Sequence, residues 1–378
     1  MKVLIPGGHL TPALAMIDWI SEHHPQVEMI FVGRKYSQLL LKQKAIEEEE
    51  VLKRGIEFIE FSSVQGANGT GSWLVTIWGL FKAIIKATII IKKYKPSVIM
   101  SFGGYLAVPL VIAAKICRIP VVAHEGTTVL GKANQLIFML ADKIACAFPQ
   151  VLNLDSNKMI KKVIVSGTPL RSAILNSKKT SCPDWFFNQE NKPILLILGG
   201  NQGSLAINNF IKQHLKQLVS GWVIVHQCGR PNKLNRYQDE LLLQAKKDKI
   251  DSNDYYVQEW INDNDLSWFY QNCQLAISRA GINTLEEIIY HQVPSLLIPL
   301  PHSNYKEQER NATYLQEQGA ALVIFQDEMS LEKVMEKLIY LQDNLQQFKK
   351  NIKTVNRPNP IKAAQLLFEA MVNLTTSE

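Results

Sequence analysis

Short runs of apolar and β-branched residues alternate along the chain with longer segments of helical periodicity, which is the pattern of parallel sheets covered by helices. The predicted strands fall into two series, and each series opens with a strand that runs into a helix through paired glycines. The first series comprises Val3–Ile5, Met29–Val32, Ser97–Met100 and Val121–Ala123, and the second comprises Ile194–Leu198, Val223–Val225, Leu275–Ser278 and Leu296–Ile298. The pattern therefore predicts an α/β protein with two Rossmann-like, doubly wound parallel-sheet domains.

Two interruptions set the predicted domain boundaries. The strand Val163–Val165 runs into the turn Ser166–Pro169, and we place the domain hinge just after it. Near the other end, the proline-rich segment Asn356–Pro360 breaks a helix that runs through Val334 to Phe348. We predict a first domain at residues 1–170, a second at residues 171–356, and a last helix within residues 357–378, from about Ile361 to Val372, that returns to the first domain.

Composition narrows the class of protein. With 378 residues, of which 47% are hydrophobic, the chain is long enough for two globular domains. The first residues run straight into a glycine turn without a signal-peptide pattern, so a cytoplasmic protein is expected. The five cysteines are scattered without CxxC spacing, which predicts neither a disulfide framework nor a zinc site. A net charge of +7 favours an anionic partner, with nucleic acid the weakest candidate because no RNA- or DNA-binding motif occurs.

The strongest local signal is the glycine-rich segment Gly199–Ser204, which follows a predicted strand and opens a helix. Glycines let the backbone approach a ligand, and the outward N–H groups of a helix start suit a diphosphate. A tight turn without a ligand explains the segment equally well. Arg171 follows an earlier turn and could bind phosphate oxygens through two parallel hydrogen bonds, although a surface arginine would give the same sequence.

A second candidate group lies further along the second half. The segment Ser278–Glu287 is predicted to be a strand end, a small-residue turn and a helix whose first turn carries Glu286 and Glu287. These acids either complement the helix dipole or, held near the end of a strand, accept hydrogen bonds from a ribose. After the next strand, Glu307 and Gln308 stand at a helix start, where carboxylate and amide groups can bind sugar hydroxyls.

In the first half, His9 lies at the mouth of a helix, with Thr11 as the predicted N-cap and Pro12 at the first helical position. A histidine there can act as a general base, since imidazole titrates near neutrality, or it can be a capping or surface residue. The pair His124 and Glu125, at the end of another predicted strand, supplies a second acid–base candidate.

The segment from Trp73 to Lys95 has a different character. Apolar residues recur in it at helical spacing while lysines interrupt or follow them, and it is too rich in lysine to span a bilayer. It is either an ordinary core-facing amphipathic helix or one that lies in the membrane interface and attracts anionic lipid. The residues expected to meet a membrane are Trp73, Leu74, Ile77, Trp78, Phe81, Lys82 and Lys86.

Taken in order, these segments resemble the MurG family of bacterial glycosyltransferases over nearly the whole chain. The matching motifs are Gly7–His9 with Pro12–Ala15, Phe102–Tyr105 with Pro109, His124–Glu125, Gly167–Arg171, Gly199–Gly203, Glu259–Ile261, Arg279–Glu287, and Gln308 with Asn311–Ala312. The resemblance implies a member of glycosyltransferase family 28 with the GT-B fold, in which two Rossmann-like domains face each other across a cleft. It also implies inverting transfer of N-acetylglucosamine from UDP-N-acetylglucosamine to the 4-hydroxyl of undecaprenyl-diphosphate-linked N-acetylmuramyl peptide, which converts lipid I to lipid II in peptidoglycan synthesis.

The resemblance further implies a role for each motif. In the second domain the UDP-sugar would contact Arg171, Asn201, Gln202 and Gly203 through its diphosphate, Trp260 and Ile261 through uracil, Glu287 through ribose, and Glu307 and Gln308 through the sugar. In the first domain the acceptor would contact Gly7, Gly8, Gly103, Gly104, Tyr105 and Thr127, with His9 as the first and Glu125 as the second candidate for the base. No metal or cofactor is expected beyond the UDP-sugar donor, since Arg171 and a helix start would meet the charge of the diphosphate. The enzyme would be peripheral, on the anionic cytoplasmic face of the cell membrane.

Three departures from the family pattern lie at these expected contacts. The first glycine loop lacks a Gly-Thr-Gly run that the family usually has before the histidine. Gly126 and Thr127 stand where the family has glutamine and asparagine, and Asn201 stands where serine is usual. The segment from His302 to Gln308 is one residue longer than its counterpart.

Other functions are compatible with parts of this pattern. A UDP-sugar epimerase or another lipid-directed transferase would share the scaffold, and a non-catalytic membrane scaffold would use only the segment from Trp73 to Lys95. Binding to liposomes would argue against an epimerase, and binding of UDP would argue against a scaffold. A nicotinamide dehydrogenase is disfavoured because neither glycine loop has GxGxxG spacing.

Overall fold

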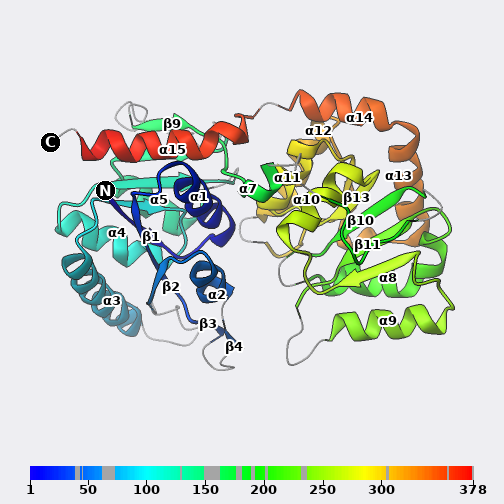
Figure 1. Ribbon diagram of the computed structural model, residues 1–378, viewed down its shortest axis with the longest axis horizontal. Helices are drawn as coiled ribbons and strands as arrows, with labels where there is room; N and C mark the ends of the chain where they lie inside the picture. The colour runs from blue at the N-terminus through cyan, green and yellow to red at the C-terminus, as the bar shows by residue number, and fades with distance from the viewer. Residues whose placement is uncertain are drawn as a thin grey trace. The chain divides into compact units, whose positions relative to one another are not determined.

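The computed structural model describes residues 1–38, 43–44, 46–61, 73–127, 130–148, 162–175, 181–188, 192–200, 203–230, 236–303, 306–355 and 357–376. Of the described residues within 36–46 and 73–77, only the backbone is described. By their contacts the described residues form two compact units, and Figure 1 labels many of the elements of both. The first unit comprises Met1–Ser172 with Arg357–Glu378, and the second comprises Ala173–Asn356.

The first unit contains a parallel sheet with helices on both faces. Its elements are β1 (Lys2–Pro6), α1 (Leu10–His23), β2 (Glu28–Gly33), β3 (Tyr36–Gln38), β4 (Gln43–Lys44), α2 (Ile46–Lys53), β5 (Glu57–Glu60), α3 (Trp73–Tyr94), β6 (Val98–Ser101), α4 (Ala107–Ile116), β7 (Val121–Glu125), α5 (Lys132–Leu140), β8 (Lys143–Cys146), β9 (Val163–Val165) and α15 (Pro360–Thr375). Within the described residues, seven strands pair in the order β5-β2-β1-β6-β7-β8-β9, and β3 pairs with β4 in a separate antiparallel ribbon.

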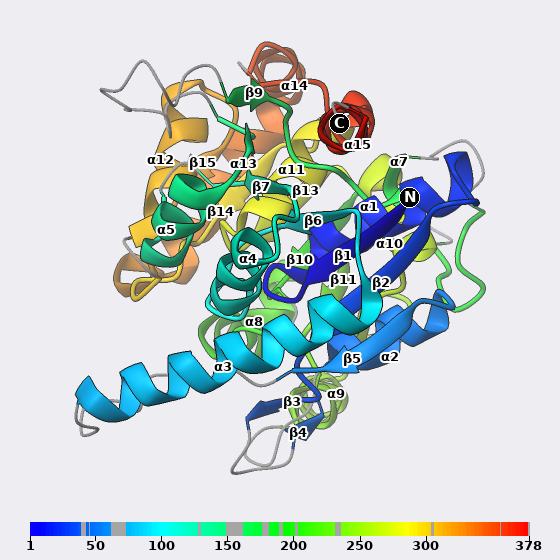
Figure 2. The same ribbon diagram turned by 90° about the vertical axis from the view of Figure 1, so that its left-hand side faces the viewer.

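Burial explains why apolar runs form this sheet. The strand β7 is buried along its whole length, as expected for a parallel strand covered on both faces. One face packs against α3, α4 and α5 through residues such as Ala87, Leu110 and Phe138. The other face packs against α1 and α15 through residues such as Ile17 and Leu367, and Figure 2 shows this unit from a second direction. The last helix, α15, contacts α1, β6 and β7.

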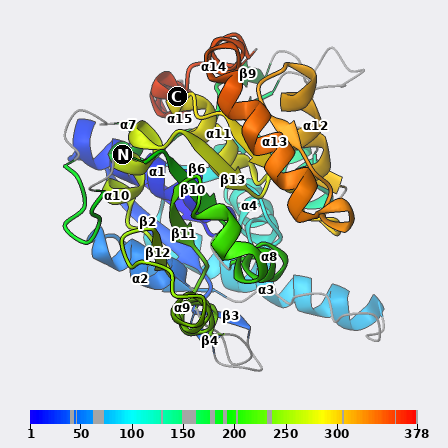
Figure 3. The ribbon, with the colours of Figure 1, turned by 90° about the vertical axis from the view of Figure 1, so that its right-hand side faces the viewer.

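The second unit repeats the architecture. After α7 (Ser172–Leu175), which starts at the boundary, come β10 (Ile194–Leu198), α8 (Leu205–Leu218), β11 (Val223–Gln227), α9 (Tyr237–Lys247), β12 (Tyr255–Gln258), α10 (Asp263–Asn272), β13 (Leu275–Ser278), α11 (Ile282–His291), β14 (Ser295–Leu297), α12 (Glu307–Glu317), β15 (Leu322–Val323), the 3-10 helix η4 (Gln326–Glu328), α13 (Leu331–Asp343) and α14 (Leu345–Lys353). The six parallel strands described here pair in the order β12-β11-β10-β13-β14-β15. Figure 3 shows α8, α9 and α13 on this unit, and one core cluster joins these helices to the sheet.

The strand order of each sheet reverses direction at one point. In the first sheet this switch point lies between β1 and β6, and in the second it lies between β10 and β13. Ligands of doubly wound folds bind at the carboxyl ends of the strands beside such a point. A ligand site is therefore expected at the turns that follow β1, β6, β10 and β13.

One predicted helix is wrong in its extent. The helix expected to run through Val334 to Phe348 is divided into α13 and α14 at Asn344, which has a non-helical backbone (φ −114°, ψ 23°). The side-chain amide of Asn344 donates a hydrogen bond to the Tyr340 carbonyl at 2.9 Å. An asparagine side chain that bonds the backbone in this way competes with helix continuation, which explains the break.

Candidate active site

The first candidate group is the turn after β1. The N–H of Gly7 donates to the Val32 carbonyl at 2.7 Å, which fixes the turn to β2. His9 is exposed and occupies the N-cap position of α1 without a capping hydrogen bond from its side chain. The prediction that Thr11 is the N-cap and Pro12 the first helical residue is wrong, because α1 already begins at Leu10. Pro12 is tolerated at the third position since N–H groups of the first turn have no acceptor within a helix.

The turn after β6 lies against the turn after β1. A Cβ atom on Gly8 would overlap the carbonyl oxygen of Gly103, and a Cβ on Gly104 would lie 3.1 Å from the Cα of Gly8. Gly103 and Gly104 have φ of +87° and +90°, a region that favours glycine. The two glycine turns therefore meet backbone to backbone at the switch point, and the neighbouring Tyr105 is 72% exposed.

Glu125, at the end of β7, is buried in the same region. One carboxylate oxygen accepts hydrogen bonds from the Thr127 N–H (3.0 Å) and hydroxyl (2.9 Å), and the other accepts one from the Asn134 amide (2.6 Å). The Asn134 oxygen in turn accepts the N–H of Gly104 at 3.3 Å. The structure thus brings the predicted acceptor residues of the first unit together, with Asn134 as a member that sequence reasoning missed.

His124 is buried, whereas His9 is exposed. Nε2 of the His124 ring lies 2.9 Å from the Gly167 carbonyl oxygen. Burial, with a smaller contribution from the nearby His9, lowers the pKa of His124 to about 4, so its imidazole is neutral at physiological pH.

Arg171 is also buried within this unit, unlike the surface arginine considered from the sequence.

In the second unit, the glycine turn after β10 opens α8. Ser204 is the N-cap, and its hydroxyl accepts the N–H of Ile207 at 3.4 Å. Gly203 has φ +74°, and a Cβ on it would overlap the Cys228 carbonyl oxygen, so this turn packs directly on the loop after β11. Asn201 and Gln202, predicted to meet the diphosphate, lie outside the described residues.

The loop after β12 carries the predicted uracil contacts. The Ile261 N–H donates to the side-chain oxygen of Gln227 at 3.1 Å, which ties this loop to the end of β11. The guanidinium of Arg230 lies 5.8 Å from the centre of the Trp260 ring, within the range of a cation–π contact. Gln227 and Arg230 were not predicted, because each contact joins segments that are distant in sequence.

The two acids of α11 were misplaced by the sequence prediction. The helix begins at Ile282, so Glu286 and Glu287 lie in its second turn, and no acid occupies the first turn. Both side chains are buried, which excludes the role of exposed charges that complement the helix dipole. The Tyr270 hydroxyl donates to the Glu287 carboxylate at 3.0 Å.

Hydrogen bonds fix the loop after β14 and the start of α12. The guanidinium of Arg279 donates to the carbonyls of Ile298 (3.0 Å) and Pro299 (3.1 Å). The side-chain oxygen of Gln308 accepts the N–H of Leu300 at 3.1 Å, and Glu307 is the first residue of α12. Gln308 is therefore held against this loop by its oxygen.

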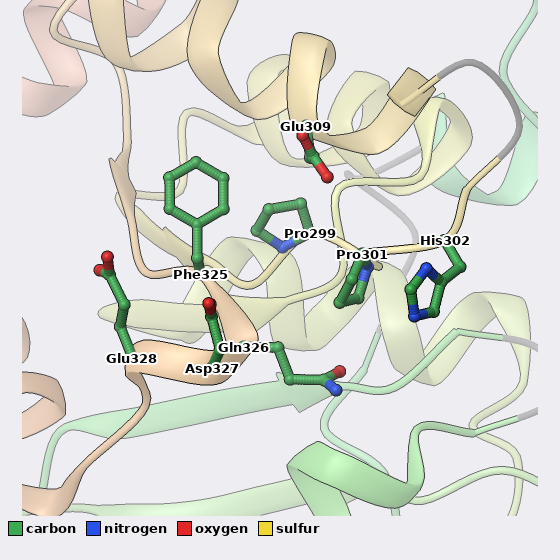
Figure 4. Close-up of a pocket in the computed structure, with 8 residues that line it drawn as sticks. All are labelled: Pro299, Pro301, His302, Glu309, Phe325, Gln326, Asp327 and Glu328. Atoms are coloured by element: carbon green, nitrogen blue, oxygen red, sulfur yellow. The ribbon is translucent and has the colours of Figure 1, made fainter.

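A pocket of about 450 Å³ adjoins the same loop (Figure 4). It is lined by Pro299, Pro301, His302, Glu309, Phe325, Gln326, Asp327 and Glu328. Gln326 also accepts a hydrogen bond from Arg279 at 2.7 Å. The predicted sugar contacts Glu307 and Gln308 do not line this pocket.

The helix α3 exposes large apolar side chains. Trp78, Phe81, Lys82 and Lys86 are exposed, and the rings of Trp78 and Phe81 meet edge to face at 5.8 Å. The side chains of Trp73, Leu74 and Ile77 lie outside the described residues. None of the helices in the described ranges is both long and apolar enough to cross a bilayer. In the same ranges, no three His, Cys, Asp or Glu side chains are placed to hold a metal ion.

Comparison with known proteins identifies the family. The N-terminal domain model of glycosyltransferase family 28 matches residues 6–146, and its C-terminal domain model matches residues 194–366. A curated protein of Clostridium botulinum (strain Loch Maree / Type A3) is 32% identical over 96% of each chain. It is named UDP-N-acetylglucosamine--N-acetylmuramyl-(pentapeptide) pyrophosphoryl-undecaprenol N-acetylglucosamine transferase, and a protein of the same name from Clostridium tetani is 30% identical over 95% of each chain. This chain belongs to the MurG family.

Solved structures agree with membership of the MurG family at the level of fold. The crystal structure of MurG from Acinetobacter baumannii matches with a TM-score of 0.69 and 23% identity over 98% of this chain and 99% of that one. A UDP-GlcNAc 2-epimerase from Neisseria meningitidis matches with a TM-score of 0.65 and 14% identity over 99% and 100% of the two chains. The predicted α/β class with two Rossmann-like parallel-sheet domains is therefore confirmed, and the chain is a glycosyltransferase by its family.

Proposed function

We propose that this protein transfers N-acetylglucosamine from UDP-N-acetylglucosamine to the 4-hydroxyl of undecaprenyl-diphosphate-linked N-acetylmuramyl peptide, the step from lipid I to lipid II. The observation that carries the proposal is the match over 96% of each chain to a curated transferase named for this reaction. The buried Glu125 and Glu287 and the two backbone-packed glycine turns are consistent with sites for two polar substrates.

The second unit is proposed to bind the donor. Uracil contacts Trp260 and the backbone at Ile261, in a loop that Gln227 holds in place. The ribose hydroxyls bond to Glu287, whose carboxylate is oriented by the Tyr270 hydroxyl. With its oxygen engaged by Leu300, Gln308 offers its amide N–H group to the sugar, beside Glu307.

The diphosphate of the donor is proposed to meet the turn that opens α8. The N–H groups of the first turn of a helix attract anions, and Gly203 allows a close approach of the backbone there. Asn201 and Gln202 complete the set in the second unit, whereas Arg171, which was predicted to meet the same diphosphate, is buried in the first unit. Charge that develops on the departing UDP is stabilised by such preoriented dipoles, which are commonly worth about 3 to 4 kcal/mol for a single donor.

The first unit is proposed to bind the acceptor. Its diphosphate lies against the backbone of Gly7, Gly8, Gly103 and Gly104, and Tyr105 and Thr127 contact the sugar. His9 is the proposed base, because it is exposed at the start of α1, whereas His124 is buried and its pKa, lowered to about 4, makes it a weak base. It removes the proton of the 4-hydroxyl as the oxygen attacks the anomeric carbon, and UDP departs from the opposite side with inversion.

The helix α3 is proposed to hold the protein on the cytoplasmic face of the membrane. Trp78, Phe81, Ile85 and Ile89 are exposed at spacings of three and four residues, so they share one face of the helix. Lys82 and Lys86 are exposed beside them and would attract anionic headgroups. Such a surface would place the glycine turns of the first unit within reach of a lipid-linked acceptor.

The test is transfer of label from radiolabelled UDP-N-acetylglucosamine to undecaprenyl-diphosphate-muramyl peptide by the purified protein. Wild type is expected to give labelled lipid and His9→Ala very little. His23→Ala is the matched control, because His23 is an exposed histidine at the other end of α1. Absence of labelled lipid with wild type would contradict the proposed reaction, and full activity in His9→Ala would remove His9 from the role of base. Conversion of the donor without an acceptor would indicate an epimerase instead.

A further inference from the structure

The carboxylate of Glu125 is fully engaged by protein groups. Glu125 is 3% exposed and Asn134 is 4% exposed. Three hydrogen bonds, two from Thr127 and one from Asn134, end on the two carboxylate oxygens at 2.6 to 3.0 Å. Hydrogen bonds to a charged acceptor are strong, and together they hold the carboxylate in one orientation. This is the environment of a group that fixes structure rather than one that receives a substrate proton.

Asn134 extends this set of contacts to the glycine turns. Its oxygen accepts the N–H of Gly104 at 3.3 Å. Its amide fills the place that a side chain on Gly103 would take, and the carbonyl of Gly103 fills the place of a side chain on Gly8. Continuous contacts therefore run from Glu125 through Asn134 and the turn after β6 to the turn that carries the exposed His9.

We infer that Glu125 and Asn134 are positioning residues for the transfer reaction, and that the Glu125 carboxylate is not its base. They set the place of the turn Gly103–Gly104 and, through its contact with Gly8, the place of His9. The inference rests on the proposed function, because it assigns these residues to that reaction. The positioning role involves no chemical step at these residues; it requires only that each hydrogen bond of the set joins one donor and one acceptor.

The same hydrogen bonds can be made with the polarity of one bond reversed. In Glu125→Gln combined with Asn134→Asp, the oxygen of the new amide still accepts from Thr127, and its nitrogen donates to the new carboxylate. The other oxygen of that carboxylate still accepts from Gly104. Either substitution alone breaks the set, since Glu125→Gln faces a donor with a donor and Asn134→Asp faces an acceptor with an acceptor.

The experiment compares kcat and KM of wild type, the two single variants and the double variant in the transfer assay. Each single variant is expected to lose about 100-fold in kcat, the size of loss that a misplacement of about 1 Å produces, with little change in KM for the donor. The double variant is expected to recover most of that loss. The matched control is Gln365→Glu with Glu369→Gln, which alters an exposed 2.9 Å hydrogen bond on α15 and should leave kcat unchanged both singly and together.

A second measurement reads the hydrogen bonds without any substrate. The Gly104 amide is followed by its NMR resonance and its rate of hydrogen exchange, which should change in the single variants and return in the double variant. This readout stands even if wild type makes no labelled lipid, so failure of the proposed reaction and failure of the hydrogen-bond set are distinguishable. The double variant keeps every donor matched to an acceptor, so it remains a test if a single variant does not fold.

Three results would overturn the inference. If the double variant restores the Gly104 amide but not transfer, the carboxylate at position 125 acts on the substrate itself. If the single variants keep full kcat, the pair does not position the reacting groups. If the double variant fails to restore the Gly104 amide, the proposed hydrogen-bond set does not operate in the protein.

Discussion

Replacing Phe81 and Ile85 by serine should release the protein from membranes. Phe81 is 52% exposed and Ile85 47% exposed, while the small Ala83 and Ala87 face the core, the reverse of the usual arrangement on a helix of a soluble protein. Burying a whole side chain of this size is worth roughly 1.5 to 3 kcal/mol, so burial of the exposed half contributes about 1 kcal/mol for each residue. Loss of about 2 kcal/mol corresponds to membrane binding weaker by about 30-fold.

The assay is co-sedimentation with vesicles of phosphatidylglycerol or phosphatidylcholine at low and high salt. Phe81→Ser with Ile85→Ser should weaken binding under all conditions, because its contribution is apolar. Lys82→Gln with Lys86→Gln should weaken binding by about 1 kcal/mol for each lysine, only on anionic vesicles and less at high salt. The lysine pair should leave the free energy of unfolding nearly unchanged, since both lysines are exposed. The Phe81 and Ile85 pair should lower it by about 2 kcal/mol, because the other half of each side chain is buried in the folded protein.

The matched control changes exposed apolar residues elsewhere. Leu242 and Leu243 on α9 are 41% and 70% exposed, so Leu242→Ser with Leu243→Ser removes apolar surface of similar kind from the second unit. This control should bind vesicles as wild type does. If the control loses binding while the α3 variant keeps it, the assignment of the membrane surface to α3 is refuted.

Three further predictions concern the second unit. Burial lowers the pKa of His226 to about 3 from 6.5, so below pH 6.5 the unfolded chain binds a proton that the folded one does not. Stability that is fully present above pH 6.5 should therefore fall by about 2 kcal/mol between pH 6.5 and 4.5 in denaturant titrations, and His226→Asn should flatten this slope. Gly203→Ala should weaken UDP binding in calorimetry by at least about tenfold, because the new Cβ overlaps the Cys228 carbonyl and alanine is strained at the positive φ of this position. Unchanged affinity would show that this turn does not meet UDP. Tyr270→Phe should cost about 1 to 3 kcal/mol of unfolding free energy by removing a donor from the buried Glu287, with weaker UDP binding as the second readout.

The fold was predictable because parallel strands that are covered on both faces appear in the sequence as continuous apolar runs. The strand β10 is five apolar residues in a row and is buried along its whole length. Such runs alternate with amphipathic helices through both halves of the chain, and the predicted α/β class followed from that alternation. The break at Asn344 was missed, because the apolar periodicity continues across it and only the backbone bonding of the asparagine interrupts the helix.

The site was predictable as a set of turns but not as a set of contacts. Glycine pairs after apolar strands located the turns correctly in sequence. Asn134 was missed, because its two partners lie nine residues away at Glu125 and 30 residues away at Gly104, and no local pattern records such pairings. Glu286 and Glu287 were assigned to the wrong turn of α11, because the start of that helix depends on the extended backbone at Gly281.

In the second unit, as in the first, a buried asparagine fixes the surroundings of the glycine turn. The Asn208 amide donates to the Cys228 carbonyl at 2.9 Å, the same carbonyl that packs on Gly203. Its oxygen must then accept from Nε2 of the buried His226, at 3.1 Å. That places the ring proton on Nε2, so Nδ1 accepts from the Tyr255 hydroxyl at 3.0 Å.

The side chains that support the two asparagines differ in charge, and this difference has consequences for each half of the proposed reaction. In the first unit the asparagine is backed by a carboxylate, Glu125, whose charge is met by three donors. In the second it is backed by a neutral imidazole, which adds no negative charge behind the start of α8. Protonating His226 would put a proton on Nδ1 toward Tyr255 and add a buried charge, which explains why burial suppresses its titration. Acid should therefore loosen the donor turn through unfolding of the second unit, whereas the polarity of the Glu125–Asn134 bond should decide the geometry of the acceptor turn at neutral pH.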